Sequence, residues 1–176
     1  MALPFEEPEV VTLPLYDEPF VVLMPADHPL AEYEHIDSGQ LADQPLLLLG
    51  PGHCFRDQVL ESVPELIDTI NQRRETAGGV VTEGSSLETI RHMVASGLGV
   101  TVLPLSAATA MNYQPELLAV RPFVDPVPSR TVALAWRVTF PRPKAIDALA
   151  HAVAQCRDSS ATQAACGLSL RAPTRG

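Results

Sequence analysis

The chain has 176 residues, of which 46% are hydrophobic and 19% charged, and its formal net charge is −9 at pH 7. This size and apolar content fit one domain or two small lobes with a true core, and they exclude an intrinsically disordered chain. A chain with one lysine and an acidic balance is poorly suited to bind a nucleic-acid backbone by itself. The charge is uneven: residues 1–70 hold fourteen acidic side chains and one basic side chain, Arg56, whereas residues 71–176 have a net charge of +4.

The sequence favours a protein of the reducing cytoplasm. It contains no run of about 18 apolar residues, so no transmembrane helix is expected, and its first residues lack the basic and apolar regions of a signal peptide. There are only three cysteines, Cys54, Cys156 and Cys166. A small and odd number of cysteines argues against a disulfide scaffold. Without Cys-x-x-Cys or His-x-x-x-His pairs, we expect no zinc site, and we expect no cofactor.

Apolar runs that alternate with helical patterns predict an α/β fold with a largely parallel sheet. Strands are expected over 10–15, 19–25, 46–49, 80–82, 99–104 and 131–136. The run 20–24 is continuously apolar, as in a strand that is buried on both faces. Helices are expected from about residue 53 towards Pro64, from Leu87 to Gly97, and over 145–155. Residues 68–78 are polar and predict a loop.

The helix that begins at Leu87 follows the sequence Ser85-Ser86-Leu87-Glu88, which predicts a capping box. The same serines can also present the amides of a helix start to an anionic ligand. Capping is the simpler interpretation of the two.

The segment with the most chemistry is Gly52-His53-Cys54-Phe55-Arg56-Asp57-Gln58. It places a thiol after a strand and a glycine turn, at the predicted start of a helix. The helix terminus, Arg56 and His53 each favour the reactive thiolate, and Asp57 opposes it unless that carboxylate pairs with Arg56. Alternatively, Cys54 is a small buried hydrophobic residue without a redox role. The residues by themselves leave both interpretations open.

Residues 52–58 resemble the peroxide-sensing motif of the OxyR family, the hydrogen-peroxide-responsive branch of the LysR-type transcriptional regulators. Residues 86–104 resemble the core of the effector domain in these regulators, and 17–20 and 28–31 resemble the entry into its second lobe. Residues 131–137 resemble the strand that returns to the first lobe. The resemblance extends over roughly residues 3–155.

The resemblance implies a two-lobed effector domain of the type II periplasmic-binding-protein kind, N-terminally truncated, with lobe II nearly complete and lobe I partial. The expected parts are a remnant of lobe I (1–18), lobe II with the redox cysteine (19–121), a returning lobe I strand and helix (122–156), and a flexible tail (157–176).

For function, the resemblance implies a hydrogen-peroxide sensor rather than an enzyme, in a homodimer or homotetramer. It would contact DNA only through a winged helix-turn-helix that this chain lacks, and would act on RNA polymerase. Cys54 would be the peroxidatic thiol, which becomes a sulfenic acid. Gly52, His53 and Gln58 would line the peroxide pocket, and Arg56 would stabilise the thiolate.

The chain departs from the family where a resolving cysteine is expected, because that position holds Val63. Nine residues of continuous helix separate Cys54 from position 63 by about 13–14 Å. A disulfide needs Cα atoms within about 7 Å, so such a pair closes only if the segment refolds. Other functions remain open: a small-molecule effector domain with Ser85 and Ser86 at its site, a thiol peroxidase that uses an external thiol, or a non-functional fragment.

Overall fold

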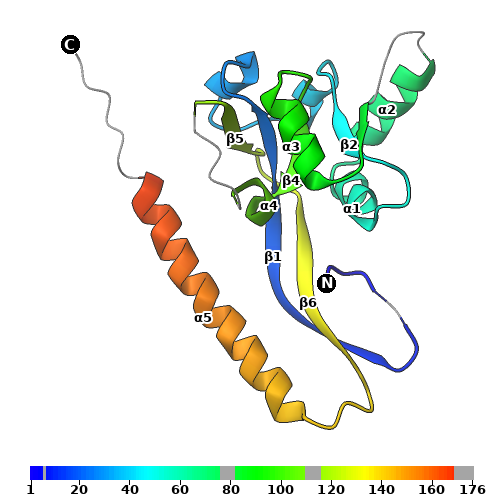
Figure 1. Cartoon of the computed structure of the whole chain (residues 1–176), viewed down its shortest axis with the longest axis vertical. Helices are drawn as coiled ribbons and strands as arrows, with labels where there is room; N and C mark the ends of the chain where they lie inside the picture. Colours follow the sequence, from blue (N-terminus) through cyan, green and yellow to red (C-terminus); the bar gives the residue numbers. More distant parts are fainter. Residues whose placement is uncertain (6, 76–81, 110–115, 169–176) are drawn as a thin grey trace. The chain divides into compact units, whose positions relative to one another are not determined.

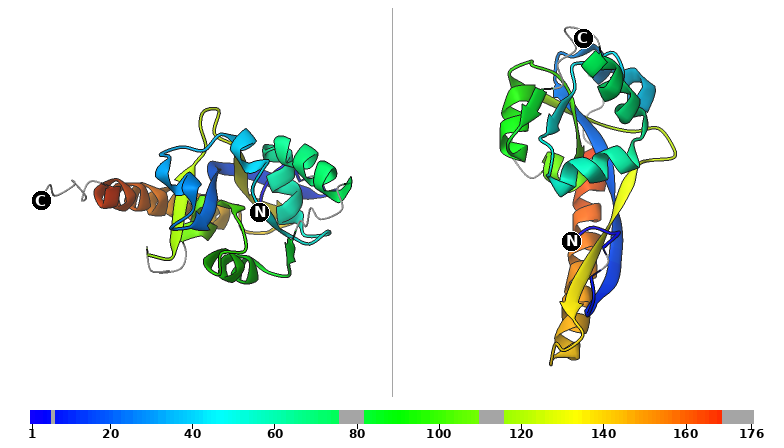
Figure 2. Two further views of the ribbon diagram at one scale, coloured as in Figure 1. Left: turned by 90° about the horizontal axis from the view of Figure 1, so that it is seen from above. Right: turned by 90° about the vertical axis from the view of Figure 1, so that its right-hand side faces the viewer.

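The computed structural model describes residues 1–5, 7–75, 82–109 and 116–168. The chain forms two compact units, Met1–Tyr16 with Thr131–Gly176 and Asp17–Arg130. Two long strands, β1 (Val10–Pro25) and β6 (Ser129–Arg137), contribute to both units and pair with each other (Figures 1 and 2). No helix among the described residues is long and apolar enough to span a membrane.

The predicted lobe boundaries after residues 18 and 121 stay a prediction. The compact units divide after Tyr16 and after Arg130, so residues 122–130 pack with the second unit. In the first unit, α5 (Pro143–Leu168) continues well past the predicted helix end at 155 into the expected flexible tail. Alanine has high helix propensity, but only three of the eight alanines in this helix lie beyond residue 155, so local propensity does not explain its extra length. Residues 169–176 lie outside the described part.

Strand β1 is the centre of the main sheet in the second unit. It pairs antiparallel with β4 (Thr101–Pro104) and with β5 (Leu118–Pro122). A separate ladder of β2 (Leu47–Leu49) and β3 (Thr82–Gly84) is parallel. The prediction of a largely parallel sheet is therefore wrong for β1. A continuous apolar run indicates burial on both faces, and it carries no information on strand direction.

The prediction that residues 20–24 are buried on both faces is confirmed. Phe20, Val22 and Met24 belong to one core cluster, together with residues of α1 (Cys54–Ser62) and α2 (Glu65–Glu75). Leu23 belongs to a second cluster, together with residues of α3 (Leu87–Ala95). These helices therefore cover the core from different sides (Figure 1).

Helix α1 begins at Cys54 as predicted, but α2 replaces most of the predicted loop over 68–78. Leu66 and Ile70 are 0% and 4% exposed. Residues four apart share one helix face, so these two side chains anchor an otherwise polar helix to the core. The end of the predicted loop and residues 80–81 of the predicted strand lie outside the described residues.

The predicted cap of α3 is confirmed in part. The Ser86 hydroxyl accepts a hydrogen bond from the Thr89 amide at 3.1 Å. Glu88 does not return to the cap; its carboxylate accepts a hydrogen bond from Arg91 at 2.9 Å. The serine hydroxyl is thus already engaged in capping the helix.

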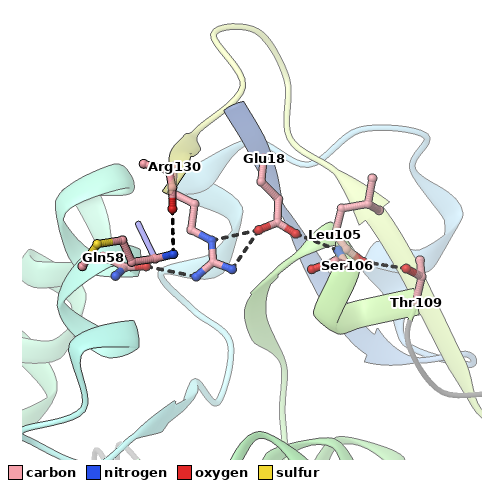
Figure 3. Close-up of polar contacts among 8 residues, drawn as sticks. Glu18, Gln58, Leu105, Ser106, Thr109 and Arg130 are labelled. Carbon is pink, nitrogen blue, oxygen red and sulfur yellow. Dashed lines mark hydrogen bonds and ion pairs between the residues drawn. The ribbon is translucent and has the colours of Figure 1, made fainter. Parts of the chain in front are cut away.

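One buried ion pair joins four elements of the second unit (Figure 3). The Glu18 carboxylate on β1 accepts bonds from Arg130 Nε at 2.9 Å and Nη2 at 2.8 Å, and from the Ser106 amide at 3.1 Å in α4 (Leu105–Thr109). Arg130 Nη1 donates to Gln58 Oε1 at 3.1 Å. The guanidinium carbon also lies 5.5 Å from the centre of the Phe55 ring.

The pKa of Glu18 lies below its ordinary value. Burial by itself raises the pKa, but the hydrogen bonds from Ser106 and Arg130, together with the positive charge of Arg130, outweigh that effect. A carboxyl group whose pKa is lowered by folding stabilises the native state above its ordinary pKa. That contribution is lost as the pH falls through the folded-state value.

We expect Glu18→Gln to destabilise the protein at neutral pH, with a difference from the natural chain that shrinks on acidification. Urea unfolding of both chains between about pH 7 and about pH 3 measures this difference. Because all other carboxylates are shared, subtraction isolates Glu18. A difference that stays constant over this range would contradict the assignment.

Gly99, between α3 and β4, has no room for a side chain. Its φ is +154°, and a Cβ there would overlap the carbonyl group of Pro45. We expect Gly99→Ala to lower the free energy of unfolding by about 2–3 kcal/mol. Among the described residues, a Cβ at Gly50 would meet only Glu83, at 3.8 Å. Gly50→Ala should therefore change the free energy of unfolding by less than about 0.5 kcal/mol. Equal effects of the two substitutions in urea unfolding would show that the Pro45 contact is unimportant.

Candidate functional site

Cys54 is the first residue of α1, and its side chain is exposed. The chain enters the helix through Gly52, whose φ is +88°, and His53 is the N-cap residue in an extended conformation. The His53 side chain makes no capping bond, although its carbonyl accepts the Arg56 amide at 2.9 Å. The sulfur therefore lies at the helix end where unpaired amides and the macrodipole favour an anion.

Arg56 points into the protein rather than along the surface with Cys54. It is 7% exposed, and Nη1 donates to the Leu49 carbonyl at 2.9 Å and to Glu83 Oε1 at 3.3 Å. Within the described residues, its ion pair is with Glu83 and not with Asp57. Arg56 thus ties α1 to β2 and β3, and any effect on the thiolate has to act through its charge at a distance or through the position of the helix.

Gln58 lies one turn beyond Cys54 and is held by Arg130, a residue that was not among those predicted from the sequence. The two residues are 72 positions apart, so no local motif connects them. A weak signal existed: a carboxylate at Glu18, inside the apolar β1 region, requires a cation, and residues 1–70 offer only Arg56. Every other candidate cation lies in residues 71–176.

Val63 lies at the opposite end of α1 and differs from Cys54 in its surroundings. It is the C-cap residue, and its amide donates to the Val59 carbonyl at 2.9 Å. Its side chain is 1% exposed and belongs to the same core cluster as Val59 and Leu66. The exposed end of the helix therefore carries Cys54, and its buried end carries Val63.

In the part of the chain that the structure describes, the other predicted features contribute no side chain to the surroundings of Cys54. A hollow of about 370 Å³ adjoins the end of α1 at Val63 and is lined by residues such as Asp37, Glu65 and Asp125, but not by the predicted peroxide-pocket residues. No group of three metal-ligating side chains occurs in the described part of the chain. Cys156 is exposed on α5 in the other unit, and the side chain of Cys166 is outside the described part.

Comparison with known proteins gives the family. The model of the LysR substrate binding domain matches residues 1–157. A probable hydrogen peroxide-inducible genes activator from Streptomyces viridosporus is 37% identical over 153 residues, which are 87% of this chain and 47% of the relative. The chain therefore spans about half the length of this curated relative.

Two solved structures are similar over most of the chain. The reduced form of the OxyR regulatory domain from Pseudomonas aeruginosa is 58% identical with a TM-score of 0.72, covering 86% of this chain and 68% of that one. A hydrogen-peroxide-bound mutant of OxyR from Corynebacterium glutamicum is 33% identical with a TM-score of 0.77, covering 100% of this chain and 54% of that one. The fold is that of the type II periplasmic-binding-like domains, and the chain belongs to the LysR substrate-binding domain family, among the OxyR regulatory domains.

Proposed function

We propose that the chain is the hydrogen-peroxide-sensing part of an OxyR-type transcriptional regulator, with Cys54 as its redox-active thiol. The observation that carries this proposal is the exposed sulfur at the first position of α1, within the motif 52–58. The peroxide-bound structure of the Corynebacterium relative supports the nature of the signal. The names of the curated relatives, which are activators of peroxide-inducible genes, favour a regulator over an enzyme.

The proposed step is a displacement on oxygen. The Cys54 thiolate attacks one oxygen of hydrogen peroxide, a sulfur–oxygen bond forms and the oxygen–oxygen bond breaks. The product is a sulfenic acid, and the leaving hydroxide takes up a proton to become water. Gly52, His53 and Gln58 would surround the peroxide, and the charge of Arg56 would favour the thiolate.

The activity of a whole regulator is a further part of the proposal. We infer that DNA binding, contact with RNA polymerase and assembly into a homodimer or homotetramer depend on a longer protein, as in relatives about twice this length. Within this chain, we infer that 1–18 and 122–156 belong to lobe I and 19–121 to lobe II.

The residue at position 63 sets the fate of the oxidised sulfur. Val63 has no thiol to condense with a sulfenic acid, and its side chain is buried in the core. We infer that oxidation of this chain stops at the sulfenic acid or ends in a bond to an external thiol. Excess peroxide would carry it to the sulfinic acid.

Treatment of the full chain with micromolar hydrogen peroxide and a sulfenic-acid probe should label the peptide that contains Cys54. The sulfur is exposed at the first position of α1, so both reagents can reach it. Mass spectrometry of digested protein identifies the labelled peptide. Cys54→Ser should remove the label, and Cys156→Ser should leave it unchanged. An inert Cys54 in the natural chain would overturn the proposed function.

Val63→Cys should restore the pairing of the family, but only through refolding. We expect peroxide to produce an intramolecular disulfide from Cys54 to the introduced thiol, with loss of helical circular dichroism, because about 13 Å of helix separates the positions. Non-reducing peptide mapping detects the bond, and adding Cys54→Ser to the same chain is the control. A disulfide that forms with α1 intact would contradict the geometry.

A further inference from the structure

The surroundings of Arg130 show how the first turns of α1 are held. Its side chain is 22% exposed, and its guanidinium makes contacts in two directions. On one side, Nε and Nη2 bind the Glu18 carboxylate, and on the other, Nη1 binds Gln58 (Figure 3). The Phe55 ring lies under the same guanidinium. Arg130 thus connects β1 with two residues that closely follow Cys54.

The orientation of Arg130 depends on Glu18. An arginine side chain has many rotamers, and a carboxylate that receives two of its N–H groups fixes the plane of the guanidinium. Glu18 is itself fixed, because it is 5% exposed and its other oxygen accepts the Ser106 amide. With the plane fixed, the third nitrogen meets Gln58 and the flat face meets Phe55.

The start of α1 depends on the same contacts. Phe55, next to Cys54, packs edge-on against Phe20 of β1 with ring centres 6.3 Å apart, so its ring is held between β1 and Arg130. Gln58 is one turn further along. His53 contributes no side-chain cap, so these two contacts, together with Arg56, fix the helix start to the sheet.

We propose that Glu18 is a positioning residue for the redox helix: by orienting Arg130 towards Phe55 and Gln58, it sets where α1 begins and thereby how fast Cys54 is oxidised. This inference rests on the proposed function for its redox consequence. Its structural half, the tethering of α1 by a carboxylate on β1, is independent of any chemistry at the sulfur.

The experiment compares Glu18→Gln with the natural chain in two measurements. We expect the second-order rate constant of Cys54 oxidation by peroxide to fall about 10-fold, because the reacting group is held less accurately. We expect amide hydrogen exchange in peptides covering 54–60 to accelerate. Glu88→Gln, which removes the charge of an ion pair on α3, is the control and should change neither measurement.

Arg130→Lys separates positioning from charge. A lysine keeps the positive charge next to Glu18, but it lacks the planar fork that reaches Gln58 and covers Phe55. It should therefore slow oxidation about as much as Glu18→Gln, and adding Glu18→Gln to it should have little further effect. If circular dichroism shows that Glu18→Gln is unfolded, Glu18→Asp takes its place. This variant keeps the carboxylate charge but shortens the side chain by one methylene group.

The outcomes distinguish the two proposals. If Cys54 of the natural chain does not react with peroxide, the proposed function fails, and hydrogen exchange alone still tests the tether. If Cys54 reacts and a folded Glu18 variant leaves both the rate and the exchange of α1 unchanged, the tether is overturned and the proposed function stands. Faster exchange with an unchanged rate would overturn the redox consequence.

Discussion

The ion pair between Glu18 and Arg130 is the constraint on which the second unit depends. A carboxylate that is 5% exposed is strongly unfavourable without a cation and hydrogen bonds. Here the cation comes from 112 residues further along the chain. The pair can form only when β1 and β6 are side by side. The contact that neutralises Glu18 therefore also holds the first and last residues of the second unit together. Helices α1 and α4 are then attached to that junction through Gln58 and Ser106.

Local patterns predicted the elements that depend on neighbouring residues. The apolar run at 20–24, the start of α1 after a glycine turn and the Ser86 cap each follow from a few consecutive side chains, and the structure has all three. Features that depend on distant chain segments were missed. The antiparallel pairing of β1 with β4 and β5 leaves no trace in the sequence of β1. Helix α2 was missed because two buried residues suffice to anchor it among polar neighbours.

In the candidate site, too, the features set by neighbouring residues were predicted and those set by distant residues were missed. The motif 52–58 identified the helix start and its sulfur, but not the direction in which Arg56 points. A helical wheel would have revealed it, since Arg56 precedes Val59 by three residues and Val63 by seven, which places it on the buried stripe. Arg130 could not be found this way. Its contacts with Gln58 and Phe55 join residues that only the folded sheet brings together.

The difference in exposure between the two ends of α1 also affects how an oxidised cysteine at either end could be reduced. Cys54 is open to solvent in this chain, so a free thiol of peptide size can attack an oxidised sulfur there without any part of the core opening. At position 63, the core encloses the side chain, and an external reductant would reach a sulfur there only during local unfolding. With Cys54 as the redox-active thiol that we propose, reduction of the oxidised sulfur would therefore take place at the surface of the protein and not in its core. Under that proposal, the lifetime of the sulfenic acid would depend on the concentration of thiols around the protein rather than on the stability of its own fold.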